Sequence, residues 1–111
     1  MIDVTLFQND SGDYVGFRMT GHAEYAEYGS DIVCAAVSVL VINTINSVEK
    51  FTDDEFNSAV HEEKDIVLFG IKSEKVSESA KLLLDSLVLG LEGIQAEYGK
   101  KYIKIKPKLW M

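Results

Sequence analysis

One histidine and one cysteine stand near each other in the first third of the chain. His22 follows Gly21, and Cys34 comes 12 positions after His22. An imidazole can accept the proton of a thiol and return it to a leaving amine, and the thiolate left behind is a strong nucleophile. The spacing lets the two side chains meet across a loop. We therefore predict that His22 and Cys34 cleave peptide bonds by covalent catalysis.

The residues around Cys34 favour this chemistry. Asp31 is a good helix N-cap, and a helix that starts there places Cys34 in its first turn. The backbone N–H groups of a first turn and the helix dipole favour a thiolate, and the same amides could form an oxyanion hole. Ser38, one turn after Cys34, would either bond the carbonyl of Cys34 or support the thiolate.

Each of these residues also has a plainer interpretation. A single cysteine in an apolar helix is most often a small buried hydrophobe, and a histidine at a strand end often bonds the backbone. Asp31 is a cap on either interpretation. His61 lies at a polar turn, where we expect it to face solvent. The neighbouring carboxylates look like solvated turn residues, and no His/Cys spacing indicates zinc.

The elements that position these residues follow from hydrophobic periodicity. Alternation of apolar and polar residues predicts strands, and apolar residues at spacings of three and four predict helices. The expected order is β-β-α-β-β-α-β, an α+β fold with two helices on a largely antiparallel sheet. The predicted strands are 2–6, 15–19, 55–61, 66–71 and 102–106, the last stopped by Pro107, and the predicted helices are 32–50 and 75–98.

The second predicted helix has more apolar residues than one buried stripe requires. Leu82, Val88 and Leu89 fall outside the stripe that runs from Val76 to Tyr98. A second apolar face indicates a homodimer. The alternative is that these side chains contact neighbouring loops.

Composition limits the class of protein. The 111 residues make one domain, 1–111, with 47% hydrophobic and 26% charged residues, as in globular proteins. We see no apolar run long enough for a membrane span and no signal peptide, so with a lone cysteine we expect a cytoplasmic protein without a membrane partner. The net charge of −7 argues against a nucleic-acid partner. The basic end, residues 100–108, fits a lysine-bearing edge strand.

Residues 21–38, GHAEYAEYGSDIVCAAVS, resemble the ribosomal-processing cysteine proteases called Prp. The family pattern is a Gly-His pair, a loop of variable composition and a D-[IL]-V-C-A-[AG]-x-[ST] run. Here it stands as Gly21-His22 followed by DIVCAAVS at residues 31–38, with no departure at the motif positions. The length and the order of elements are also similar to the family over essentially the whole chain.

The resemblance implies a homodimeric enzyme that removes a short N-terminal extension from a large-subunit ribosomal protein, cutting after aromatic residues. His22 and Cys34 would be its catalytic pair, with Gly21, Asp31 and Ser38 as supporting positions and no metal or organic cofactor. A loop over residues 23–30, with a glycine at position 29, would close over the substrate. Tyr25 and Tyr28 would then meet the substrate's aromatic side chains.

Two other classes of function remain open. One is a non-enzymatic, ribosome-associated module that binds a basic ribosomal protein, with Cys34 merely buried. The other is an RNA-binding domain, which the net charge of −7 and the lack of a basic face disfavour.

Overall fold

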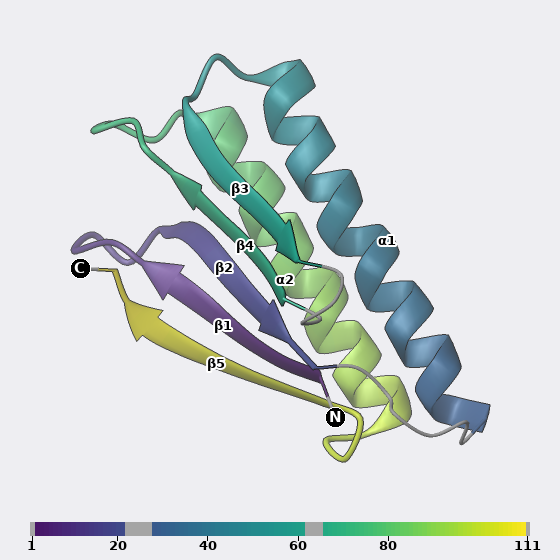
Figure 1. The fold of residues 1–111 in the computed structure, drawn as a ribbon. Helices are drawn as coiled ribbons and strands as arrows, with labels where there is room; N and C mark the ends of the chain where they lie inside the picture. The colour runs from purple at the N-terminus through teal and green to yellow at the C-terminus, as the bar shows by residue number, and fades with distance from the viewer. Residues whose placement is uncertain (1, 22–27, 62–65, 111) are drawn as a thin grey trace.

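The computed structural model describes residues 2–21, 28–61 and 66–110, and the side chains of all of these except 28–31. The expected order β-β-α-β-β-α-β is confirmed (Figure 1). The elements are β1 (Ile2–Gln8), β2 (Tyr14–Thr20), α1 (Tyr28–Phe51), β3 (Phe56–His61), β4 (Ile66–Ile71), α2 (Glu78–Tyr98) and β5 (Ile103–Leu109).

The strands form one mixed sheet with the order β3-β4-β2-β1-β5. The pairs β1–β2, β2–β4 and β3–β4 are antiparallel, and β1–β5 is parallel. Both helices lie against the same face of the sheet (Figure 1). Within residues 2–21, 28–61 and 66–110, no helix covers the opposite face, which we call the open face.

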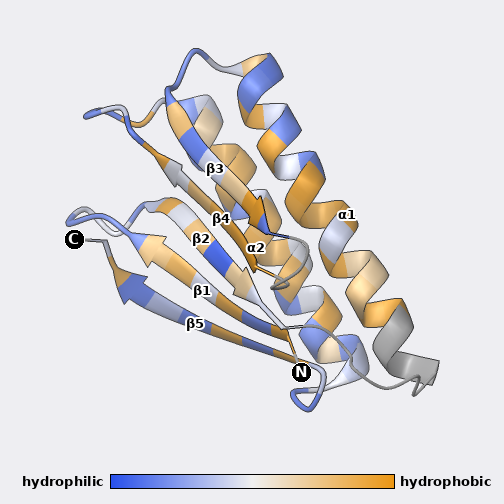
Figure 2. Ribbon diagram, in the orientation of Figure 1, coloured by the Kyte–Doolittle hydropathy of each residue, from blue (hydrophilic) through white to orange (hydrophobic). Residues whose placement is uncertain are grey.

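The core lies between the sheet and the helices, because alternate strand residues point toward the helices. Along β1, Ile2, Val4 and Leu6 are buried, and their neighbours in the register, such as Phe17 and Ile103, are fully buried too. Figure 2 shows this alternation as changes of colour along β1 and β5. The helix α1 adds a buried stripe of valines and an isoleucine: Val33, Val37, Val41, Ile45 and Val48.

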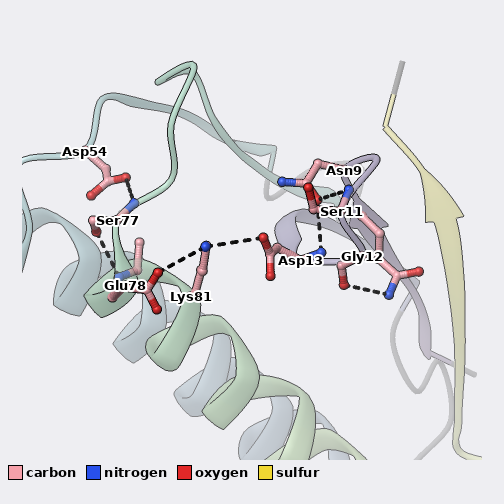
Figure 3. Close-up of polar contacts among 10 residues, drawn as sticks. Asn9, Ser11, Gly12, Asp13, Asp54, Ser77, Glu78 and Lys81 are labelled. Atoms are coloured by element: carbon pink, nitrogen blue, oxygen red, sulfur yellow. Dashed lines mark hydrogen bonds and ion pairs between the residues drawn. The ribbon is translucent and has the colours of Figure 1, made fainter.

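Polar contacts tie the start of α2 to the rest of the fold (Figure 3). Ser77 caps the helix, its Oγ accepting a hydrogen bond from the backbone N–H of Ala80 at 3.1 Å. Asp54 accepts the backbone N–H of Ser77 at 2.9 Å. One turn into α2, the Lys81 ammonium lies 3.4 Å from Asp13, in the connection between β1 and β2. The cap at Ser77 explains why α2 begins at Glu78 and not at Lys75.

Two other expected boundaries are wrong. The strand β5 runs through Pro107 to Leu109, where a stop had been expected. Because β5 is at the edge of the sheet, a residue without an N–H can face outward without losing a ladder bond. The helix α1 begins at Tyr28, before the expected cap.

The helix α1 is also long and apolar enough, from Ile32 to Phe51, to span a membrane by length and composition, contrary to the sequence-based expectation. The core helix of a soluble fold passes the same test. The buried stripe of α1 packs against the sheet and α2, which accounts for its apolar composition.

Candidate active site

Cys34 lies half-buried on α1 at a pocket of about 250 Å³ between that helix and one end of the sheet. Ser38, one turn later, also lines the pocket, so the structure brings these two predicted residues together. The rest of the lining is mostly apolar and comes from β1 to β4, from α1 and from the residue just after β2: Ile2, Met19, Gly21, Val41, Ile42, Val60, His61, Ile66 and Val67.

Gly21 lies where the chain leaves β2 and also lines the pocket. Its φ is +82°, a conformation that L-residues with a Cβ rarely adopt. A glycine at this position of the motif therefore has a physical reason. It sets the direction in which the chain leaves β2 beside the Cys34 pocket.

The expected role of Asp31 as N-cap is wrong. Since α1 begins at Tyr28, Asp31 is the fourth residue of the helix and Cys34 is the seventh. Only the first four N–H groups of a helix lack an intrahelical partner. The expectation that a first-turn dipole and free backbone amides surround Cys34 is therefore not supported.

The predicted loop is also shorter than expected at its C-terminal end. Tyr28, Gly29 and residue 30 have helical backbone and belong to α1. His22 and Tyr25 lie outside the described residues, so the predicted His22–Cys34 pair and the substrate contact of Tyr25 stay predictions.

The sheet contributes residues to the pocket that sequence reasoning did not assign to a site. Met19 and Val67 are register partners on the core face of neighbouring strands, and Val60 pairs with Val67 from β3. The alternation had predicted the strands, but only the register brings their ends beside Cys34. A strand-pairing prediction would have found them.

His61 is exposed, as expected, yet it also lines the pocket. It pairs with Ile66, and strand alternation puts this pair on the open face. His61 therefore lies at the rim of the pocket. Over residues 2–21, 28–61 and 66–110, no group of three or more His, Cys, Asp or Glu residues could hold a metal ion.

Comparison with known proteins gives a consistent result. Residues 1–104 match the family model described as "Cysteine protease Prp". The ribosomal processing cysteine protease Prp of Bacillus subtilis is 30% identical over 101 residues, covering 88% of this chain and 90% of the relative. Two crystal structures of the S. aureus protease Prp, an "essential ribosomal processing protease", are similar over 97% of this chain and 100% of theirs. The one with a substrate peptide has a TM-score of 0.88 at 27% identity. The other, with a covalently linked product peptide, has a TM-score of 0.85 at 28% identity.

Proposed function

Because the chain belongs to the cysteine protease Prp family, we propose that it removes the N-terminal extension of a large-subunit ribosomal protein in the cytoplasm. The enzyme is a cysteine protease by family, and its relatives are named for ribosomal processing. The observation that carries the proposal for this chain is the position of Cys34, its only cysteine, at an apolar pocket.

In the proposed reaction, the Cys34 thiolate attacks the carbonyl carbon of the scissile peptide bond. His22 takes the thiol proton and delivers it to the departing amine, which becomes the new N-terminus of the ribosomal protein. The extension stays bound to Cys34 as a thioester until water hydrolyses it. The covalently linked product peptide in the S. aureus relative supports such an intermediate.

The pocket supports cleavage after an aromatic residue. Its volume of about 250 Å³ is below the roughly 300–1,000 Å³ of pockets that hold whole small ligands, and is of the size for one large side chain. Its lining by Met19, Ile42 and Val60 offers apolar contact and little hydrogen bonding. The net charge of −7 suits a basic substrate.

The direct test incubates the purified protein with a large-subunit ribosomal protein that carries its extension, and reads the products by mass spectrometry. The wild type should make one cut after aromatic residues. Cys34→Ala and His22→Ala should make none while keeping the circular dichroism spectrum of the wild type. A cut by Cys34→Ala would remove the nucleophile assignment. No cut by any form, with slow alkylation of Cys34 by iodoacetamide, would favour the non-enzymatic binding module.

The subsite can be tested at Val60, whose side chain is 51% exposed and so can be enlarged without disturbing the core. Val60→Trp should partly fill the pocket and raise KM for substrates with an aromatic residue before the cut. Leu109→Trp is the matched control, because Leu109 is 55% exposed on β5 and does not line the pocket. Equal effects of both changes would argue against this pocket as the subsite.

We also propose that the protein is a homodimer that buries the outer face of its helices. Val39 of α1 is 67% exposed, and Leu82 and Leu89 of α2 are 69% and 72% exposed. Val88, the third apolar residue outside the stripe, is buried and needs no partner. Leu82 and Leu89 are two turns apart on the same face of α2, and exposed apolar residues gathered on one face are typical of an interface.

Sedimentation velocity tests the dimer. Leu82→Lys with Leu89→Lys should give a monomer, because two charges would be buried without partners in the interface. Glu92→Gln with Glu97→Gln, both exposed on the same helix, makes the same change of net charge and is the control. A wild type that sediments as a monomer at micromolar concentration would contradict the proposal.

A further inference from the structure

The open face of the sheet carries a cluster of cations. Lys104, Lys106 and Lys108 alternate along β5 with residues of the core face. Arg18 of β2 shares a register partner, Thr5, with Lys106, and so lies in the same row across the sheet. All four cations are exposed. Among the strand residues, all of which the structure describes, the open face has one carboxylate, that of Asp3.

Beside the cations lies an aromatic pair, in which Trp110 is exposed and Phe7 is half-buried. The rings of Phe7 and Trp110 meet edge to face with centroids 4.9 Å apart. Phe7, Gly16 and Gly70 are register partners on three adjacent strands, and the two glycines leave a shallow trough. The indole of Trp110 lies over Gly70 and stays 45% exposed. A groove of about 580 Å³ opens here, lined by residues that include Leu68, Lys72 and Trp110.

From this arrangement we infer that the open face binds single-stranded RNA. Cations beside an exposed indole on a sheet suit such a ligand, since lysine and arginine contact phosphates while a base stacks on the ring. An acidic peptide would use the cations alone and leave the aromatic pair without a role. The choice of RNA over DNA rests on the proposed function, because a ribosomal protein substrate is assembled with RNA.

The net charge of −7 had disfavoured a nucleic-acid partner, together with the absence of a basic face in the sequence. The fold separates the charges, however. The other carboxylates of the described residues lie on the helices and connections and not on the strands. Salt screens exposed charges beyond about 8–10 Å at physiological ionic strength. The local cluster, and not the total charge, therefore governs contacts on this face.

Protection of an edge strand explains part of the cluster, because lysines discourage pairing between sheets. It does not explain Arg18, which is on β2 with a paired strand on each side. It also does not explain an exposed indole next to the lysines. Binding to an anionic chain accounts for all of these residues together.

The test uses the intrinsic fluorescence of Trp110, the only tryptophan of the chain. Titration of the full-length protein with oligo(U) of about ten nucleotides at low salt should quench this emission. The apparent Kd should rise steeply with salt, as release of counterions from phosphates requires. Lys106→Glu with Lys108→Glu should weaken binding about tenfold or more. Lys50→Glu with Lys75→Glu makes the same charge change at exposed sites away from the open face and should change Kd by about twofold or less.

Several outcomes would overturn the inference. The first is that oligo(U) does not quench the emission at low salt. The second is that the Lys106/Lys108 and Lys50/Lys75 variants lose the same affinity for oligo(U). The third is that polyglutamate binds as tightly as oligo(U). Equal binding of a single-stranded DNA oligonucleotide of the same length as the oligo(U) would overturn the choice of RNA. RNA binding and proteolysis can be tested independently. Cys34→Ala should still bind RNA, and the Lys106→Glu/Lys108→Glu variant should still cut an isolated ribosomal protein. Circular dichroism checks that each variant is folded.

Discussion

The indole of Trp110 lies against Gly70 so closely that a β-carbon on Gly70 would stand 2.9 Å from the Cη2 atom of the ring. The two residues are 40 positions apart in the chain. Gly70 is on β4 and Trp110 follows β5, and β2 and β1 lie between these two strands in the sheet. The chain end is further held by the backbone N–H of Trp110, which donates to the carbonyl of Gln8 at 2.7 Å. The absence of a side chain at Gly70 thus creates the place where the tryptophan rests.

We therefore expect Gly70→Ala to displace the indole and expose it to water. The emission maximum of Trp110 should shift to longer wavelength, and acrylamide should quench it more readily. The loss of stability should be small, below about 1–3 kcal/mol, because a ring at the chain end can move aside. Gly93→Ala, where a β-carbon meets nothing within 4 Å, should leave the emission unchanged. An unshifted spectrum for Gly70→Ala would contradict the contact.

Alanine variants of Gly21 and Gly12 distinguish an effect of backbone strain on stability from an effect on catalysis. Both have positive φ, +82° and +84°, but Gly12 is in the turn of the first hairpin and Gly21 lines the Cys34 pocket. Alanine at either position should cost about 1–2 kcal/mol of stability, measured by urea unfolding. Only Gly21→Ala should also lower kcat/KM for the ribosomal substrate, because it redirects the chain that leads to His22. Equal activity of the two variants would show that Gly21 has no positioning role.

Sequence periodicity predicted the helices and strands well but could not identify the strand residues that line the Cys34 pocket. The alternation of Ile2, Val4 and Leu6 has one physical cause, burial of one face, and the structure confirms it. The pocket depends on which strands pair, and Met19 and Val60 carry no local signal for that. The motif residue Cys34 was found because its neighbours match a family pattern, and the pocket that it lines is consistent with that prediction.

The start of α1 and the cation cluster show two other limits. Gly29 and Asp31 have poor intrinsic helix propensity, so local preference favoured a later start than the one that the fold adopts. The lysines of β5 were visible in the sequence, but Arg18 joins them only through the register of β1 with β2. A net charge cannot reveal such a face, because it sums over surfaces that lie apart.

Ser77 should contribute to stability as the cap of α2. Ser77→Ala removes the acceptor for the N–H of Ala80 and should cost about 0.5–2 kcal/mol. Ser79→Ala, an exposed change two residues later inside the helix, should be neutral or slightly stabilising. Thermal unfolding of the two variants gives the comparison. If Ser77→Ala and Ser79→Ala unfold at the same midpoint temperature, water replaces the Ser77 hydroxyl without loss of stability.

The pH dependence of stability should report on Asp54. Burial opposes its ionisation, but hydrogen bonds from Ser77, Thr52 and the backbone of Asp54 together outweigh burial, and the pKa of Asp54 lies below its ordinary value of 3.8. A depressed pKa in the folded state stabilises the fold above the ordinary value, and that contribution is lost as the pH falls through the folded pKa. Asp54→Asn should therefore be less stable than the wild type near neutral pH. The difference in free energy of unfolding between the two proteins should become smaller as the pH falls below the ordinary pKa of Asp54. If that difference in free energy of unfolding does not change with pH, ionisation of Asp54 is not coupled to folding.

Two glycines of α2 should respond to alanine with different signs. Gly93 is exposed and a β-carbon there meets nothing, so Gly93→Ala should gain most of the roughly 1 kcal/mol difference in helix propensity. Gly90 faces α1, and a β-carbon there would stand 2.9 Å from Cδ1 of Leu40. The leucine must move, and since it is half-buried among packed neighbours, the steric cost should cancel or exceed the gain in propensity. Urea unfolding of Gly90→Ala, Gly93→Ala, Leu40→Ala and the Gly90→Ala/Leu40→Ala double variant tests this. The smaller residue at position 40 relieves the clash, so the cost of Gly90→Ala should disappear in that background; if it persists, contact with Leu40 is not its cause.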